Sequence, residues 1–161
     1  MQLLKLIIVL LAFAGLAQLR LLGDPRERST VPAASPVGRF VVQDAGQTVF
    51  DRVSGLHWQQ GEAATLMTWA AAKTWCANNT PTLPGVGWRM PTIGELQQLI
   101  DRQAPHAPYI DDAFASTSNQ LFWTTSPAEP NFAWLVRFQF GYTSTAYVLD
   151  AGAVFTVRCV R

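Results

Sequence analysis

The chain has 161 residues, of which 49% are hydrophobic and 14% are charged, and its formal net charge at pH 7 is +1. This length suits one ordinary domain with a short appendage, and the composition predicts a folded chain rather than a disordered one. A net charge so close to zero offers no electrostatic footprint for nucleic acid, so we do not expect a nucleic-acid-binding protein.

Residues 1–22 have the features of a secretory signal peptide. Lys5 precedes an apolar run from Leu6 to Ala17 that ends in small residues suited to cleavage. The run is shorter than the roughly 20 residues that a membrane span needs, and an extension past it would include Gln18 and Arg20. We therefore expect a signal peptide, with an uncleaved N-terminal membrane anchor as the alternative.

Residues 23–38 are rich in proline, serine and charge, so they are predicted to form an exposed linker. Residues 39–161 then form the predicted domain. Together these segments predict an exported protein of the periplasm, the cell surface or the extracellular medium, with anchoring in the inner membrane as the alternative. We expect no other contact with a membrane.

The domain is predicted to begin with short strands. "RFVV" (39–42) and "TVFDR" (48–52) are strand-like runs on either side of a turn that contains Gly46. A further turn leads into a third short strand through His57 and Trp58.

Two helices are predicted to follow. The first begins after Thr68 as its N-cap and ends at Asn78, and the second begins after Pro91 with the capping-box spacing of Thr92 and Glu95. Apolar residues recur every three or four positions in both segments, as expected of helices with one buried face: Trp69, Ala72, Trp75 and Cys76 in the first, and Ile93, Leu96, Leu99 and Ile100 in the second.

The last part of the chain is predicted to return to strands. "APHAPYIDDAF" (104–114) is a long irregular loop, and three aromatic and β-branched runs follow it at 121–126, 132–140 and 154–161. The order is therefore strands, two helices and strands again. This order predicts an α+β fold with a small antiparallel sheet.

The two cysteines, Cys76 in the first helix and Cys159 in the last strand-like run, have two possible uses. In an exported chain they most simply form one disulfide bond. The alternative is a catalytic thiol, which needs a positively charged or histidine-rich neighbourhood. Neither cysteine has a histidine close to it in sequence, so the disulfide is favoured.

Six motifs in the same order resemble the Lcl C-terminal domain family. They are "TVFDRVSGLHWQ", "TWAAAKTWC", "GWRMPTIGELQQLID", "FWTTS", "AWLVRF" preceding Gly141, and "VRCVR". The match covers residues 40–161, with Met90 where the family usually has leucine. The resemblance implies a C-type-lectin-like fold, related to the formylglycine-generating and sulfatase-modifying group, with a disulfide from the first helix to the last strand. It also implies an extracytoplasmic location, and the founding adhesin of the family binds sulfated polysaccharides.

The densest motif, "GVGWRMPTIGEL", is interpreted as a folding element. Gly85 and Gly87 permit a tight turn, Trp88 can anchor it to the core, and Arg89 can pair with a carboxylate. The alternative is a sugar-stacking and sulfate-binding pair of Trp88 and Arg89. The residues interpreted as structural across the domain are Trp58, Trp69, Trp88, Arg89, Pro91, Thr92, Glu95, Trp123 and Trp134.

The candidate ligand-binding surface consists of the loops at 104–119 and 126–131. An anionic glycan would also require basic groups such as Arg102 and Arg137 near these loops. Exposed aromatic rings there could stack on sugars or fit a protein partner. The candidate ligand-binding residues are Tyr109, Asp111, Asp112, Glu129, Asn131 and Phe132.

No metal site or cofactor is predicted. Glu129-Pro130-Asn131 matches the calcium- and mannose-binding tripeptide of true C-type lectins, but those proteins supply further oxygen ligands from a later Trp-Asn-Asp strand, which this chain lacks. Asp150 is the one acidic residue after the tripeptide. The two histidines, His57 and His106, are far apart in sequence and do not suggest a zinc site.

These observations predict a non-catalytic, exported binding module, adhesin-like or envelope-associated, that recognises a polysaccharide or a surface protein through its loops. The alternative is a structural subunit of a pilus, secretion or surface assembly, held by its N-terminal segment. An enzyme of the formylglycine-generating type is disfavoured, because such enzymes use paired cysteine thiols, whereas the two cysteines of this chain stand at the positions of the disulfide that the resemblance implies.

Overall fold

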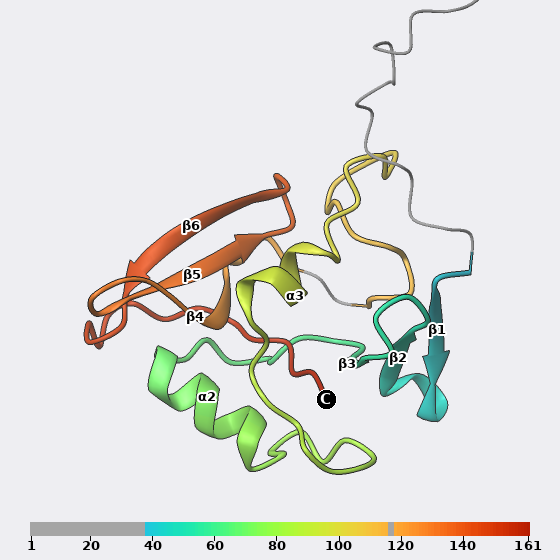
Figure 1. The fold of residues 1–161 in the computed structure, drawn as a ribbon, viewed down its shortest axis with the longest axis horizontal. Helices are drawn as coiled ribbons and strands as arrows, with labels where there is room; N and C mark the ends of the chain where they lie inside the picture. Colours follow the sequence, from blue (N-terminus) through green and yellow to red (C-terminus); the bar gives the residue numbers. More distant parts are fainter. Residues whose placement is uncertain (1–37, 116–117) are drawn as a thin grey trace, which may run out of the picture. The chain divides into compact units, whose positions relative to one another are not determined.

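The computed structural model describes residues 38–115 and 118–161 (Figure 1). The predicted signal peptide or anchor (1–22) and nearly all of the predicted linker (23–38) lie outside the described residues. Within them, no helix is long and apolar enough to cross a membrane. The α+β class is confirmed, but two small antiparallel sheets, each of three strands, replace the single predicted sheet.

The first sheet contains β1 (Phe40–Gln43), β2 (Thr48–Asp51) and β3 (His57–Gln59), with β2 in the middle. The short 3-10 turn η1 (Asp44–Gly46) joins β1 to β2, as the position of Gly46 predicted. Val49 pairs with Trp58 across β2 and β3, and both side chains are buried.

A buried ion pair fixes the start of this sheet. The Arg39 guanidinium donates to both carboxylate oxygens of Asp51, at 2.8 and 2.7 Å. Burial alone would raise the pKa of Asp51, but hydrogen bonds from Arg39, Ser54 and the Val53 amide outweigh it and lower that pKa to about 2. Asp51 therefore stays ionised, and the pair persists, across the physiological pH range.

Helix α2 (Trp69–Ala77) begins and ends where the sequence predicted. The Thr68 hydroxyl accepts a hydrogen bond from the Ala71 amide at its start, and Asn78 forms its C-cap. Ala72 and Cys76 are fully buried, whereas Trp69 and Trp75 pack against the core at its margin.

Helix α3 (Ile93–Gln97) has the predicted capping box. The Thr92 hydroxyl accepts from the Glu95 amide, and the Glu95 carboxylate accepts from the Thr92 amide. The helix is shorter than predicted, because residues after Gln97 continue as turns. Leu96 and Leu99 are nevertheless buried as the predicted stripe required.

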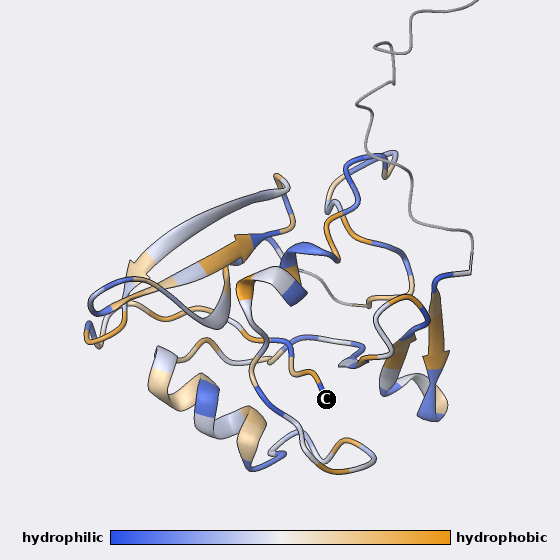
Figure 2. Ribbon diagram, viewed as in Figure 1, coloured by the Kyte–Doolittle hydropathy of each residue, from blue (hydrophilic) through white to orange (hydrophobic). Residues whose placement is uncertain are grey.

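The second sheet contains β4 (Phe122–Glu129), β5 (Phe132–Arg137) and β6 (Tyr142–Tyr147), with β5 in the middle. Strand β6 was not predicted. Its sequence, YTSTAY, is dominated by hydroxyl-bearing residues that alternate without a buried apolar set. Figure 2 shows the contrast, with β5 largely hydrophobic and β6 much more polar. The predicted run 132–140 is a strand only as far as Arg137.

The prediction of a continuous last strand at 154–161 was wrong. This C-terminal segment forms isolated bridges instead: Phe155 with Met67, Thr156 with Phe122, and Val160 with both Trp58 and Arg89. No single neighbouring strand runs beside it for long enough to make a ladder. The segment is still buried from Thr156 to Val160.

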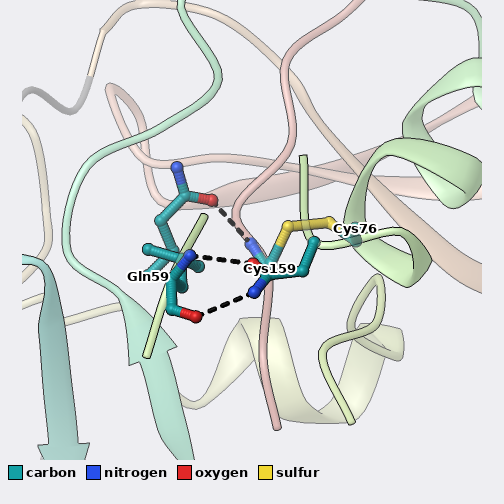
Figure 3. Close-up of a disulfide and its surroundings, with 5 residues drawn as sticks. Gln59, Cys76 and Cys159 are labelled. Carbon is teal, nitrogen blue, oxygen red and sulfur yellow. Dashed lines mark hydrogen bonds between the residues drawn. A yellow bond between two sulfur atoms is a disulfide. The ribbon is translucent and has the colours of Figure 1, made fainter. Parts of the chain in front are cut away.

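The predicted disulfide is present and joins this segment to helix α2. Cys76 and Cys159 are bonded, with their Cα atoms 5.5 Å apart and both side chains fully buried. Gln59 bonds the backbone of Cys159 in two ways. Its side-chain oxygen accepts from the Cys159 backbone amide, and its backbone amide donates to the Cys159 carbonyl (Figure 3). The disulfide therefore joins α2 to the C-terminal segment, and the hydrogen bonds of Gln59 hold that segment to β3.

The core has two parts. One part gathers around the disulfide and includes Trp88 and Trp123, and the other gathers around Trp58, Phe122 and Phe138. The C-terminal segment contributes to both parts, with Val157 and Cys159 in the first and Val160 in the second.

We predict that Trp88→Ala lowers the free energy of unfolding by roughly 3–5 kcal/mol, as expected for a buried aromatic side chain. Trp88 is 3% exposed, and its indole N–H donates to the Pro84 carbonyl at 3.2 Å. Val86→Ala is the matched control, since Val86 lies in the same loop and is 87% exposed. Chemical denaturation of both variants measures the difference. Equal stabilities would show that the loop is not anchored through Trp88.

Candidate functional site

The polar side chains of the "GVGWRMPTIGEL" motif make their contacts within the domain. Arg89 pairs with Glu95 through two hydrogen bonds of 2.9 and 2.6 Å. These bonds, against the opposing effect of burial, lower the pKa of Glu95 to about 2. Gly85 has a φ of 88°, a conformation that strains any other residue, and a Cβ there would lie 2.8 Å from the Arg161 guanidinium carbon, so that side chain would also have to move.

Two arginines and three aromatic rings gather where the β5–β6 turn meets the irregular loop. We call Arg102, Tyr109, Arg137, Phe140 and Tyr142 the arginine–aromatic cluster. A cavity of about 240 Å³ is lined by Arg102, Tyr109 and Phe140. The rings of Phe140 and Tyr142 stack with their centroids 6.0 Å apart and their planes 9° apart, and both side chains are exposed.

Backbone contacts fix the geometry of this cluster. Arg102 donates to the Gly141 carbonyl at 2.9 Å, and the Tyr109 amide donates to the Phe138 carbonyl at 2.8 Å. Gly141 has a φ of 61°, and a Cβ there would lie 3.4 Å from the Ile100 side chain. The irregular loop and the strand turn are therefore held in close contact.

Arg137 is oriented by neutral partners. Its guanidinium carbon lies 4.8 Å from the centroid of the Phe140 ring, and it donates to the Asn119 side-chain oxygen at 3.1 and 2.8 Å and to the Tyr142 hydroxyl at 3.3 Å. Within residues 38–115 and 118–161, neither Arg137 nor Arg102 forms an ion pair with a carboxylate. In this described part of the chain, both positive charges therefore lack a close acidic partner.

A second hollow lies beside β4 and β5, with a volume of about 280 Å³. We call it the bulge groove. It brings together three predicted ligand residues with residues that the sequence did not suggest for binding. Its lining is Trp69, Thr125, Pro127, Glu129, Asn131, Phe132, Ala133 and Val148.

The six predicted ligand-binding residues are therefore divided. Glu129, Asn131 and Phe132 line the bulge groove, and Tyr109 lies in the arginine–aromatic cluster. Asp111 accepts from the Ala113 amide at 2.9 Å and so stabilises its own turn, while Asp112 is exposed and lines neither hollow.

Sequence reasoning missed several residues of these two hollows. Trp69 was assigned a structural role alone, although its ring also forms a wall of the groove. Phe140 and Tyr142 flank Gly141, so an aromatic-glycine-aromatic turn was the available signal. No pattern marked Pro127 or Val148, because their place in the groove depends on how β4 and β6 pair with β5.

The histidines lie apart from both hollows. The His57 ring packs against Phe50, and burial, together with the charge of Arg161, lowers the pKa of His57 below its usual value. His106 is exposed in the irregular loop. Across the described residues, no three His, Cys, Asp or Glu side chains are arranged to hold a metal ion.

These features define a small α+β domain that is tied by one disulfide and carries two surface hollows of different chemistry. The chain belongs to the Lcl C-terminal domain family, whose sequence model matches residues 47–161. The resemblance predicted from the six motifs is therefore confirmed. A comparison with curated proteins found no match.

We predict that calcium does not stabilise the protein. Glu129 and Asn131 supply one carboxylate and one amide, whereas calcium takes six to eight oxygen ligands. Because only a ligand that prefers the folded state raises stability, millimolar calcium or a chelator should leave the melting temperature unchanged. Differential scanning fluorimetry measures this. A clear rise with calcium that Asn131→Ala abolishes would contradict the prediction.

Proposed function

We propose that this chain is a non-catalytic, exported binding module that recognises an anionic polysaccharide through the arginine–aromatic cluster. The observation that carries the proposal is the pair of arginines, Arg102 and Arg137, which lie among exposed aromatic rings without a close acidic partner in the described part of the chain. A C-type-lectin-like fold, which presents binding loops on a rigid scaffold, belongs to the same proposal.

The chemistry of the cluster suits a sulfated or carboxylated sugar. A guanidinium offers several N–H donors in a planar fork that matches the oxygens of such anions. The faces of Tyr109, Phe140 and Tyr142 can pack against the apolar faces of sugar rings. Arg137 and Arg102 are already oriented by Asn119, Tyr142 and Gly141, which reduces the entropy lost on binding.

Two further observations support the non-catalytic and exported parts of the proposal. Both cysteines are consumed by the disulfide, so neither is available as the thiol of a formylglycine-generating type of reaction. Disulfides persist in oxidising compartments outside the cytosol, as expected of an exported protein. Retention of the first residues as an anchor would serve a surface module equally well.

We predict that the full chain binds dextran sulfate and does not bind uncharged dextran. Arg102→Ala and Arg137→Ala should each weaken the binding roughly tenfold, as for the loss of a hydrogen bond to a charged group. Binding should also weaken as the salt concentration rises. Surface plasmon resonance on immobilised dextran sulfate measures both effects.

The matched control is Arg52→Ala, which removes the same charge at an exposed position whose guanidinium bonds the Gly38 carbonyl. This variant should keep nearly all of the affinity. If Arg52→Ala weakens binding as much as Arg137→Ala, the attraction is a property of net charge alone. That result, or equal binding to dextran and dextran sulfate, would overturn the proposal.

A further inference from the structure

The bulge groove forms where the middle of β4 stops pairing regularly with β5. The pairing of β4 with β5 shifts register between Trp123 and Pro127 and again between Pro127 and Glu129. Thr125, between Trp123 and Pro127, bonds to Pro91 through both of its hydrogen-bond donors instead of to β5. Its backbone amide and its hydroxyl both donate to the Pro91 carbonyl, at 2.8 and 3.2 Å. The irregularity is thus held by specific bonds, as in bulges that open a strand next to a binding site.

Two aromatic side chains form fixed walls of the groove. The Trp69 indole N–H donates to the Thr124 carbonyl at 2.9 Å, so its ring is held against the displaced part of β4. The Phe132 ring contacts Tyr147 on β6 with centroids 5.3 Å apart. Rings held in this way provide apolar surface without a large loss of side-chain entropy on binding.

Two polar side chains lie at the turn end of the groove. Glu129 is the last residue of β4, and Asn131 lies in the turn with a φ of 65°. The backbone carbonyl of Asn131 accepts a hydrogen bond from the Val148 amide at 2.8 Å. A carboxylate accepts hydrogen bonds, and an amide both accepts and donates them. Together they match a ligand that carries several hydroxyl groups beside an apolar face.

The charge around the groove favours a neutral ligand. Glu129 is the one ionisable residue in its lining, and the Lys73 ammonium lies 5.2 Å from the centroid of the Trp69 ring that forms one wall. Lys73 is not part of that lining, so the charge of the lining is one solvent-exposed carboxylate, which repels anions and, because water and salt screen it, attracts cations only weakly. This differs from the arginine–aromatic cluster, where both charges are positive.

We propose that the bulge groove binds a single neutral sugar ring, without calcium, at a second site that is independent of the arginine–aromatic cluster. One face of the ring packs on Trp69 and Phe132, and its hydroxyl groups bond to Glu129 and Asn131. A ligand of this size with few polar contacts binds weakly, with a Kd on the order of 1 mM. The site thus adds a neutral ligand to a module proposed to bind anionic polymers.

The test is saturation-transfer NMR on the full chain with the methyl glycosides of glucose, galactose, mannose and N-acetylglucosamine as probes, in the presence of a chelator. At least one probe should receive saturation and shift the indole N–H signal of Trp69. Glu129→Ala and Asn131→Gly should each weaken that binding roughly tenfold. Glycine at 131 tolerates the positive φ, so the turn is kept.

Asp112→Ala is the matched control, because it removes an exposed carboxylate that lines neither hollow and should leave the binding of the glycoside unchanged. Arg137→Ala should also leave it unchanged, which separates this site from the anionic one. The proposal is overturned if no probe receives saturation, if Glu129→Ala and Asn131→Gly bind as the unmodified chain does, or if glucosamine or glucuronate binds more tightly than its neutral counterpart.

Discussion

The C-terminal segment, residues 154–161, is the constraint on which the rest of the domain depends. Its backbone bonds β3 through His57 and Gln59, the "GWR" loop through Arg89, and the start of β4 through Trp123, while Cys159 ties it to helix α2 (Figure 1). Arg158, which is fully buried, adds hydrogen bonds to the carbonyls of Gln59 and Gln60. The two sheets are therefore held together through a segment that belongs to neither.

The second sheet has one irregular pairing, between β4 and β5, and one turn that is held against a neighbouring loop, and a hollow lies at each of these places. The Pro91 carbonyl draws Thr125 away from β5, and the bulge groove opens beside it. At the other end, the turn through Phe140 and Gly141 closes against Arg102, and the arginine–aromatic cluster forms there. Both candidate sites are thus consequences of how β4 to β6 are anchored to the remainder of the domain.

Local features of this fold could be predicted from the sequence, and distant ones could not. The caps at Thr68 and Thr92 depend on residues three positions away, and the disulfide required no choice of partners, because the chain has two cysteines. The isolated bridges of the C-terminal segment depend on partners from about 35 to 100 positions away that are met one at a time. The grouping of Glu129 and Asn131 with Trp69 followed from a strand register that no local pattern specifies.

Native-state hydrogen exchange tests the central role of the C-terminal segment most directly. The amides of Gln59, Ala63, Arg89 and Trp123 all donate to carbonyls of residues 156–160. If the segment unites both sheets, these four amides should exchange with the same free energy of opening, that of global unfolding. Exchange of the Trp123 amide through a smaller local opening, while Gln59 and Arg89 stay protected, would show that the second sheet unfolds independently and would contradict this role.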